Sequence, residues 1–208
     1  MENLNLTLYV SIIIPLGFAM IIFDKKARVN FLFMMIGLTV CLFCGELSTI
    51  VASQIPFSMR YITTNITPVI EEFFKALPIL IYAFVYDPKK HQLYEAAIAV
   101  GVGFAILENA YILAGDADFA TLIYGILCGL GAGTLHALAT FLVGVGMSYI
   151  HKKPKLFYTG TVALLSTAII IHSIYNSIIS TDFYVIGMLI PVSIFIPTVL
   201  YLKKKKLL

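Results

Sequence analysis

The chain has 208 residues, of which 60% are hydrophobic and 12% are charged, and its formal net charge is +3. A soluble domain of this length does not have so apolar a composition, which is typical of polytopic membrane proteins. The composition therefore excludes a soluble globular fold. We expect the lipid bilayer as its surroundings and no nucleic acid as a partner.

Apolar segments about 20 residues long recur along the whole chain, and each is long enough to cross a bilayer. They predict an all-α fold of about seven transmembrane helices, in which residues 1–208 form a single integral membrane domain. The predicted spans are residues 4–23, 31–53, 66–86, 93–114, a part of 119–150, 156–179, and a last segment between Thr181-Asp182 and the terminal lysines 203–206.

Basic residues in the connecting loops predict the orientation of the chain. Twelve of the 14 Lys and Arg residues lie in alternate loops and at the C-terminus, whereas the opposite loops hold only Arg60 together with acidic residues. Because cytoplasmic loops are enriched in Lys and Arg, we expect the N-terminus outside and the C-terminus in the cytoplasm. Lysine-rich and arginine-poor usage favours a bacterial or archaeal cell membrane.

The third predicted span contains charged residues where hydrocarbon is expected. Glu71, Glu72 and Lys75 lie in an otherwise apolar stretch, and because ionised groups are costly in a bilayer they usually have a function there. At helical pitch Glu71 and Lys75 are i,i+4 neighbours. The alternative is that the helix begins at Thr67, with Pro68 at its first position, and that the glutamates are interfacial carboxylates stabilised by the helix dipole.

Three later spans carry polar groups that we expect in the middle or outer half of the membrane. The fourth contains Glu108 and Asn109, the fifth contains His136, and the sixth contains His172 and Asn176 on one helical face. Each of these side chains alone is explained by a hydrogen bond between helices. Four helices that deliver such groups to a similar depth indicate one site.

Other polar and small residues in the spans favour structural roles. Small residues recur every four positions in the fifth span and predict a close approach of another helix there. The three cysteines fit small buried apolar positions better than a redox or metal pair. Glu95 fits a structural role, and Glu46 is deep in the second span without an evident partner. The small residues are Gly125, Gly129, Gly133 and Ala137, and the cysteines are Cys41, Cys44 and Cys128.

Two histidines, an asparagine and several carboxylates are the groups needed to activate water. A glutamate backed by a histidine can act as general base, while a second histidine and an asparagine amide donate to an oxyanion. Equally, two histidines and a glutamate are a zinc ligand set with an open fourth position, and the spare glutamate is then the base. The metal ligands would come from His136, His172, Glu108 and Glu71.

The chain closely resembles the PrsW intramembrane proteases in four motifs. More distantly, it is similar to the CAAX prenyl endopeptidase and bacteriocin-processing (CPBP, or Abi) superfamily. The resemblance covers residues 71–176, and the catalytic helices would occupy about residues 65–180. The motifs are, in chain order, Glu71-Glu72-x-x-Lys75, Gly101-x-Gly103-Phe104-Ala105-x-x-Glu108-Asn109-x-Tyr111, His136, and His172-x-x-x-Asn176.

The resemblance implies an intramembrane endopeptidase that makes a site-1-type cut in the extracytoplasmic part of a single-pass membrane protein, such as an anti-sigma factor. It implies that Glu71 and Glu72 activate water with His136. It further implies that His172 and Asn176 stabilise the oxyanion or help to bind a metal ion, for which zinc is the candidate. The residues that would complete the site are Glu108, Asn109 and Lys75.

Two functions of other classes are also compatible with these residues. One is a non-catalytic membrane scaffold that binds a partner protein. The other is a proton-coupled transporter, since buried Glu, His and Lys residues can form a relay. The two halves of the chain show no repeat of interrupted helices, which is the usual sign of a transporter.

Overall fold

The computed structural model describes residues 4–23, 28–115, 121–150 and 153–208, so the predicted loops at 24–27, 116–120 and 151–152 lie outside the described residues. The described chain is all α-helical, as the sequence predicts, and has no strand. Its long helices are α1 (Leu4–Ile22), α2 (Arg28–Gln54), α4 (Thr67–Tyr86), α5 (Lys90–Gly115), α6 (Leu122–Met147), α7 (Pro154–Ile179) and α8 (Tyr184–Lys204). A short helix α3 (Met59–Tyr61) and a π-helical turn η1 (Ile62–Ile66) lead into α4.

Six of the described helices are long and apolar enough to cross a membrane, namely all the long ones except α4. Helix α4 has 20 residues, which span about 30 Å at 1.5 Å per residue. It differs from the others because it carries Glu71, Glu72 and Lys75. The protein is therefore a multi-pass membrane protein, and α4 corresponds to the predicted third span.

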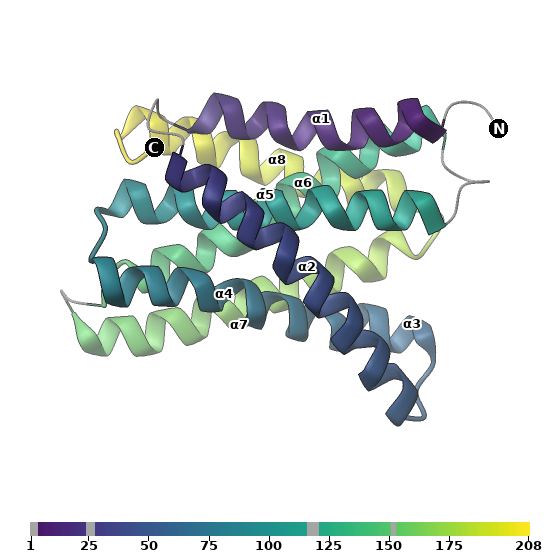
Figure 1. Cartoon of the computed structure of the whole chain (residues 1–208), viewed down its shortest axis with the longest axis horizontal. Coiled ribbons are helices and arrows are strands. Elements are labelled where there is room, and N and C mark those ends of the chain that lie inside the picture. The colour runs from purple at the N-terminus through teal and green to yellow at the C-terminus, as the bar shows by residue number, and fades with distance from the viewer. Residues whose placement is uncertain (1–3, 24–27, 116–120, 151–152) are drawn as a thin grey trace.

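The helices lie side by side along the long axis of the molecule, and the two chain ends lie at opposite ends of the bundle (Figure 1). Because the long helices alternate in direction, the helix ends that carry Arg28, Lys90, Lys155 and Lys203 share one end of the bundle, whereas Arg60 lies toward the other. This distribution is the one on which the predicted orientation rests. The orientation itself stays a prediction.

Helices α5 and α6 form the centre of the bundle. In their apolar stretches 67% and 78% of the residues are buried, against 17% to 33% in α1, α2, α7 and α8. The small-residue ridge of α6 explains part of this packing, because a Cβ atom at Gly125 would lie 2.8 Å from the Thr7 carbonyl oxygen and one at Gly133 would lie 2.9 Å from Cγ of Pro15. The close approach predicted from the ridge is confirmed, and its partner is α1.

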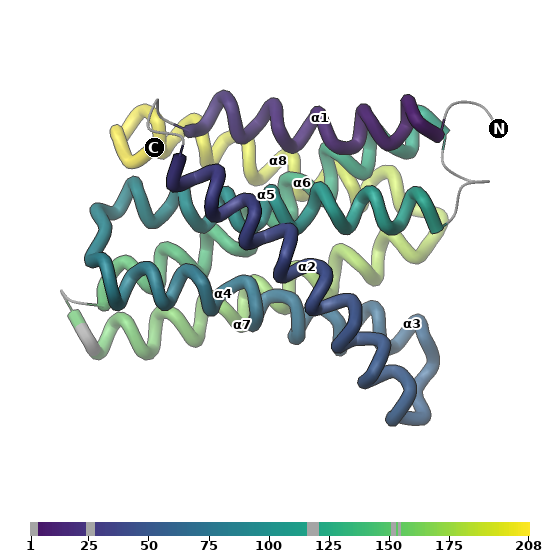
Figure 2. Tube along the Cα trace, in the orientation of Figure 1, coloured from purple at the N-terminus to yellow at the C-terminus, as the bar shows by residue number. Residues whose placement is uncertain are grey.

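Helix α2 crosses the bundle obliquely, so that its C-terminal end and α3 lie beyond the edge of the other helices (Figure 2). Glu46 lies on α2 and is exposed. Nearer the start of the same helix, Nδ2 of Asn30 donates to Oε2 of Glu95 at 2.7 Å, and both side chains are buried. Glu95 thus joins α2 to α5, in keeping with its expected structural role.

Candidate active site

Helix α4 begins at Thr67, as the interfacial alternative requires, but its glutamates are not at a surface. Glu71 is 6% exposed, and Glu72 and Lys75 are fully buried. These three residues lie on the face of α4 that packs against its neighbours in the bundle. An interfacial position therefore does not account for the carboxylates, since the fold takes both of them inside.

Glu72 joins Lys75 to one of the two histidines, His172. Its Oε1 accepts from Nζ of Lys75 at 2.6 Å and from Nδ1 of His172 at 2.7 Å. Because an ionised carboxylate only accepts hydrogen bonds, Nδ1 of His172 carries the proton. The other ring nitrogen, Nε2, is then an acceptor that Glu72 leaves free.

Lys75 also contacts the other histidine, His136. Its Nζ lies 2.8 Å from Nδ1 of His136, and Nε2 of His136 lies 2.5 Å from Oε2 of Glu108 on α5. An ammonium group only donates, so Nδ1 of His136 accepts and Nε2 donates to Glu108. The lysine further lies 4.6 Å from the ring centroid of Phe104. A single buried ammonium therefore orients one glutamate and one histidine.

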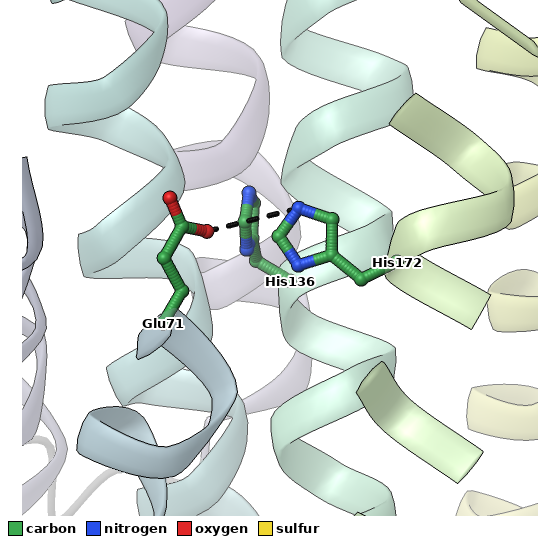
Figure 3. A group of neighbouring side chains, drawn as sticks. All are labelled: Glu71, His136 and His172. Atoms are coloured by element: carbon green, nitrogen blue, oxygen red, sulfur yellow. Dashed lines mark ion pairs between the residues drawn. The ribbon is translucent and has the colours of Figure 1, made fainter. Parts of the chain in front are cut away.

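Two carboxylate oxygens of this network are buried without a hydrogen-bond partner among the described residues, Oε2 of Glu72 and Oε2 of Glu71. Glu72 accepts two hydrogen bonds on its other oxygen, whereas the described residues give Glu71 none, and Nε2 of His172 lies 3.7 Å from its Oε2. Figure 3 shows the Glu71 carboxylate and the His172 ring turned toward one another, with His136 beside them. Buried polar atoms nearly always have partners, so an atom without one marks a place for water, an ion or a substrate.

Glu71, His136 and His172 also offer the donor atoms of a metal site. One ligand atom from each lies within 4.8 Å of the others, and two histidines with a carboxylate are a common catalytic zinc set. Nε2 of His172 and Oε2 of Glu71 are free to serve, and Glu72 supplies the second contact that metal-binding histidines usually have. His136 offers a nitrogen only after it exchanges its contact with Glu108 or Lys75. The residues fit a metal ion on that condition.

Residues 25–202 match the PrsW family intramembrane metalloproteases. The chain belongs to this family. The protein is accordingly an intramembrane protease, and it acts on membrane-protein substrates within the lipid bilayer. The resemblance seen in the four motifs is confirmed, and the matched range contains every predicted site residue. No curated protein and no solved structure gives a match.

The glycines of the PrsW-like motif on α5 allow the helices that carry the site to approach closely. A Cβ atom at Gly101 would lie 2.6 Å from the carbonyl carbon of His136, and one at Gly103 would lie 2.8 Å from that of Met34. Side-chain carbon atoms do not come so near to backbone atoms. Gly101 therefore sets how closely α5 packs against α6 at His136.

The structure brings six of the predicted residues into one cluster and places the two asparagines elsewhere. Nδ2 of Asn176 donates to the carbonyl oxygen of Thr63 at 3.0 Å. Nδ2 of Asn109 donates to the carbonyl oxygens of Cys128, at 3.3 Å, and Ser11, at 3.5 Å. Both amides thus bond to backbone in the described chain. The six residues of the cluster are Glu71, Glu72, Lys75, Glu108, His136 and His172.

The turn to which Asn176 bonds was not predicted. Neither Thr63 nor the π-helical turn around it stands out in the sequence, where its signal is Pro68, three residues before the first glutamate.

Proposed function

We propose that the protein is an endopeptidase that hydrolyses a peptide bond of a membrane-tethered protein with water activated by Glu71 and the two histidines. One observation carries this proposal. Oε2 of Glu71 and Nε2 of His172 face each other at 3.7 Å inside the bundle, a distance too long for a hydrogen bond. Neither atom satisfies the other, so a water molecule between them would find two partners.

The hydrogen bonds around His172 say what such a water would do. Since Nδ1 donates to Glu72, Nε2 is an acceptor, and an ionised Glu71 is an acceptor too. A water between them gives a proton to each and directs its lone pairs away from both groups. That orientation suits a nucleophile whose proton Glu71 takes as general base.

Glu72 and Lys75 have positioning roles in this scheme. Oε1 of Glu72, which Lys75 and His172 share, keeps the proton of His172 on Nδ1. Lys75 holds Glu72 and His136 together. His136 carries its proton on Nε2 and donates it to Glu108. A substrate carbonyl that replaces Glu108 as the acceptor would receive this hydrogen bond as it gains negative charge during attack.

The family's name implies a metal ion, and we place it at Glu71, His136 and His172. A zinc ion bound there would polarise the substrate carbonyl and increase the acidity of water. In that case Glu108 would have to give up its hydrogen bond with His136, because its Oε2 accepts from Nε2 of His136. Glu72 keeps its role, since it holds the His172 nitrogen that a metal would not use.

The substrate that we propose is a single-pass membrane protein of the anti-sigma-factor kind, cut in its extracytoplasmic part in the membrane of a bacterial or archaeal cell. The motif resemblance supports the substrate class. The basic residues gathered at one end of the bundle support a cytoplasmic C-terminus. In that orientation the cluster lies in the middle or outer half of the bilayer.

The test is cleavage of a membrane-tethered reporter by purified protein in lipid vesicles, with and without a chelator, followed by metal analysis. Cleavage that is lost with chelator and restored by zinc supports the metal-dependent form of the proposal. Cleavage that persists with no bound metal supports general-base catalysis by the glutamate and histidines alone. A protein that cuts no tethered reporter, although it is folded, contradicts the proposal.

A further inference from the structure

The π-helical turn before α4 leaves one backbone carbonyl without its regular partner. In η1 the N–H of Thr67 donates to the carbonyl of Ile62, five residues back. The same spacing assigns the next carbonyl, that of Thr63, to the N–H of residue 68. Residue 68 is a proline and has no N–H. The Thr63 carbonyl therefore needs a donor from outside the turn.

Asn176 supplies that donor. Its Nδ2 lies 3.0 Å from the Thr63 carbonyl oxygen. One turn earlier on α7, Nδ1 of His172 bonds to Glu72 on α4. Helix α7 thus holds this part of the chain at two points, one on each side of Pro68. Both contacts come from one face of α7, because His172 and Asn176 are four residues apart.

We propose that Asn176 is a positioning residue, which fixes the π-helical turn through the Thr63 carbonyl and so fixes where Glu71 and Glu72 lie relative to the histidines. This inference rests on the proposed function, and it gives Asn176 a role different from stabilising an oxyanion. Glu71 follows Pro68 by less than one helical turn. A rearrangement of η1 therefore reaches the catalytic carboxylates directly.

Loss of the donor to the Thr63 carbonyl has a structural consequence. Thr63 is exposed and lies just before the predicted span at 66–86, and a backbone carbonyl there that loses its protein donor favours a change of conformation that brings it another N–H. Without the Asn176 amide, we expect η1 to rewind so that Thr63 finds another donor. The start of α4 would turn with it, and the carboxylates would leave their positions.

The decisive experiment returns the missing N–H. Pro68→Ala gives residue 68 a backbone donor, so the Thr63 carbonyl no longer depends on Asn176. We would compare the native protein, Asn176→Ala, Pro68→Ala and the double variant in the reporter assay. Asn176→Ala should lower kcat/KM about tenfold or more in the native background and less than about threefold in the Pro68→Ala background. The loss should appear in kcat, because the water-activating groups are displaced.

Two further variants on α7 define what the amide contributes. Asn176→Asp keeps the shape of the side chain but has no N–H, so it should behave like Asn176→Ala. Ser177→Ala is the matched control, because Ser177 is exposed and, among the described residues, its hydroxyl bonds only to the Ser173 carbonyl of its own helix. It should leave kcat/KM within about twofold of the native value.

Thermal unfolding of the native protein, the two single variants and the double variant gives a readout that does not depend on cleavage. The drop in Tm caused by Asn176→Ala should be smaller in the Pro68→Ala background. Equal losses of kcat/KM in both backgrounds overturn the proposal, because an amide that donates to the substrate oxyanion acts whatever residue 68 is. If the native protein cuts no reporter, the proposed function fails, and the unfolding data alone decide the link to Thr63, which equal drops in Tm overturn.

Discussion

Two buried carboxylates of the protein, Glu95 and Glu71, have the same exposed fraction of 6% and opposite surroundings. Glu95 accepts a hydrogen bond from the Asn30 amide at 2.7 Å and joins α2 to α5. Glu71 has a buried oxygen without a hydrogen-bond partner in the described chain. Burial alone therefore does not identify the carboxylate that we propose as general base. Unmet hydrogen-bonding capacity separates Glu71 from Glu95, because a structural carboxylate is normally satisfied, and Glu71 shares this feature with Oε2 of Glu72 in the same cluster.

The surroundings of the two carboxylates also differ in what they can do to water. The Glu95 pair involves two helices and a neutral amide. The Glu71 cluster draws side chains from α4, α5, α6 and α7, and it includes two histidines whose rings lie 4.9 Å apart and nearly perpendicular. Only the second arrangement offers several proton acceptors around one point.

The largest effect is expected from the histidines. His172→Ala and His136→Ala should each lower kcat for reporter cleavage by about 10²–10⁴-fold, the range for loss of a group that moves or holds the reacting proton. Both variants should still accumulate in the membrane. Near-native cleavage by either one would mean that the cluster is not the hydrolytic site. The Glu71 cluster would then not differ in function from the Glu95 pair.

A smaller loss is expected from Lys75, which acts through its contacts with Glu72 and His136. Lys75→Met leaves Glu72 buried without its counter-ion and should destabilise the fold by about 3–5 kcal/mol. Cleavage should fall about 10- to 100-fold, because Glu72 and His136 lose their common orienting group. Thermal unfolding and reporter cleavage measure the two effects. Adding Glu72→Gln should restore part of the stability, and a double variant as unstable as the sum of the single ones would contradict the pairing.

The smallest effect is expected from the packing of α5 on α6. Gly101→Ala places a methyl group against the backbone at His136, and overpacking of this kind costs about 1–3 kcal/mol. Cleavage should fall with it as the histidine shifts. Gly45→Ala on α2 is the matched control, because nothing lies within 4 Å of a Cβ atom there. Equal unfolding temperatures for the two variants would show that α5 and α6 can separate without cost.

Much of the fold could be predicted from the sequence because a bilayer imposes simple rules. The length of the apolar segments predicted the helices, and the charges in α4 stood out against the apolar background. The clustering of Glu71, Glu72, Glu108, His136 and His172 followed from their similar depth on four helices.

The partners of individual side chains could not be predicted in the same way. Helical spacing shows that His172 and Asn176 share a face, but not that one meets a carboxylate and the other a backbone carbonyl. That difference arises from η1, the π-helical turn that leads into α4 and contains Thr63. The oblique path of α2 depends likewise on packing rather than on periodicity. Sequence patterns define faces, and the contacts between faces depend on how the helices pack.

The most direct test of the account is to neutralise each of the two equally buried carboxylates in turn. Glu71→Gln and Glu95→Gln would be purified in lipid and compared with the native protein for cleavage of the membrane-tethered reporter, with unfolding temperature as the measure of folding. We predict that Glu71→Gln loses cleavage while it stays folded and that Glu95→Gln cleaves at the native rate. Cleavage retained by Glu71→Gln, or lost equally in both variants at native stability, would contradict the assignment of Glu71 as the group that activates water.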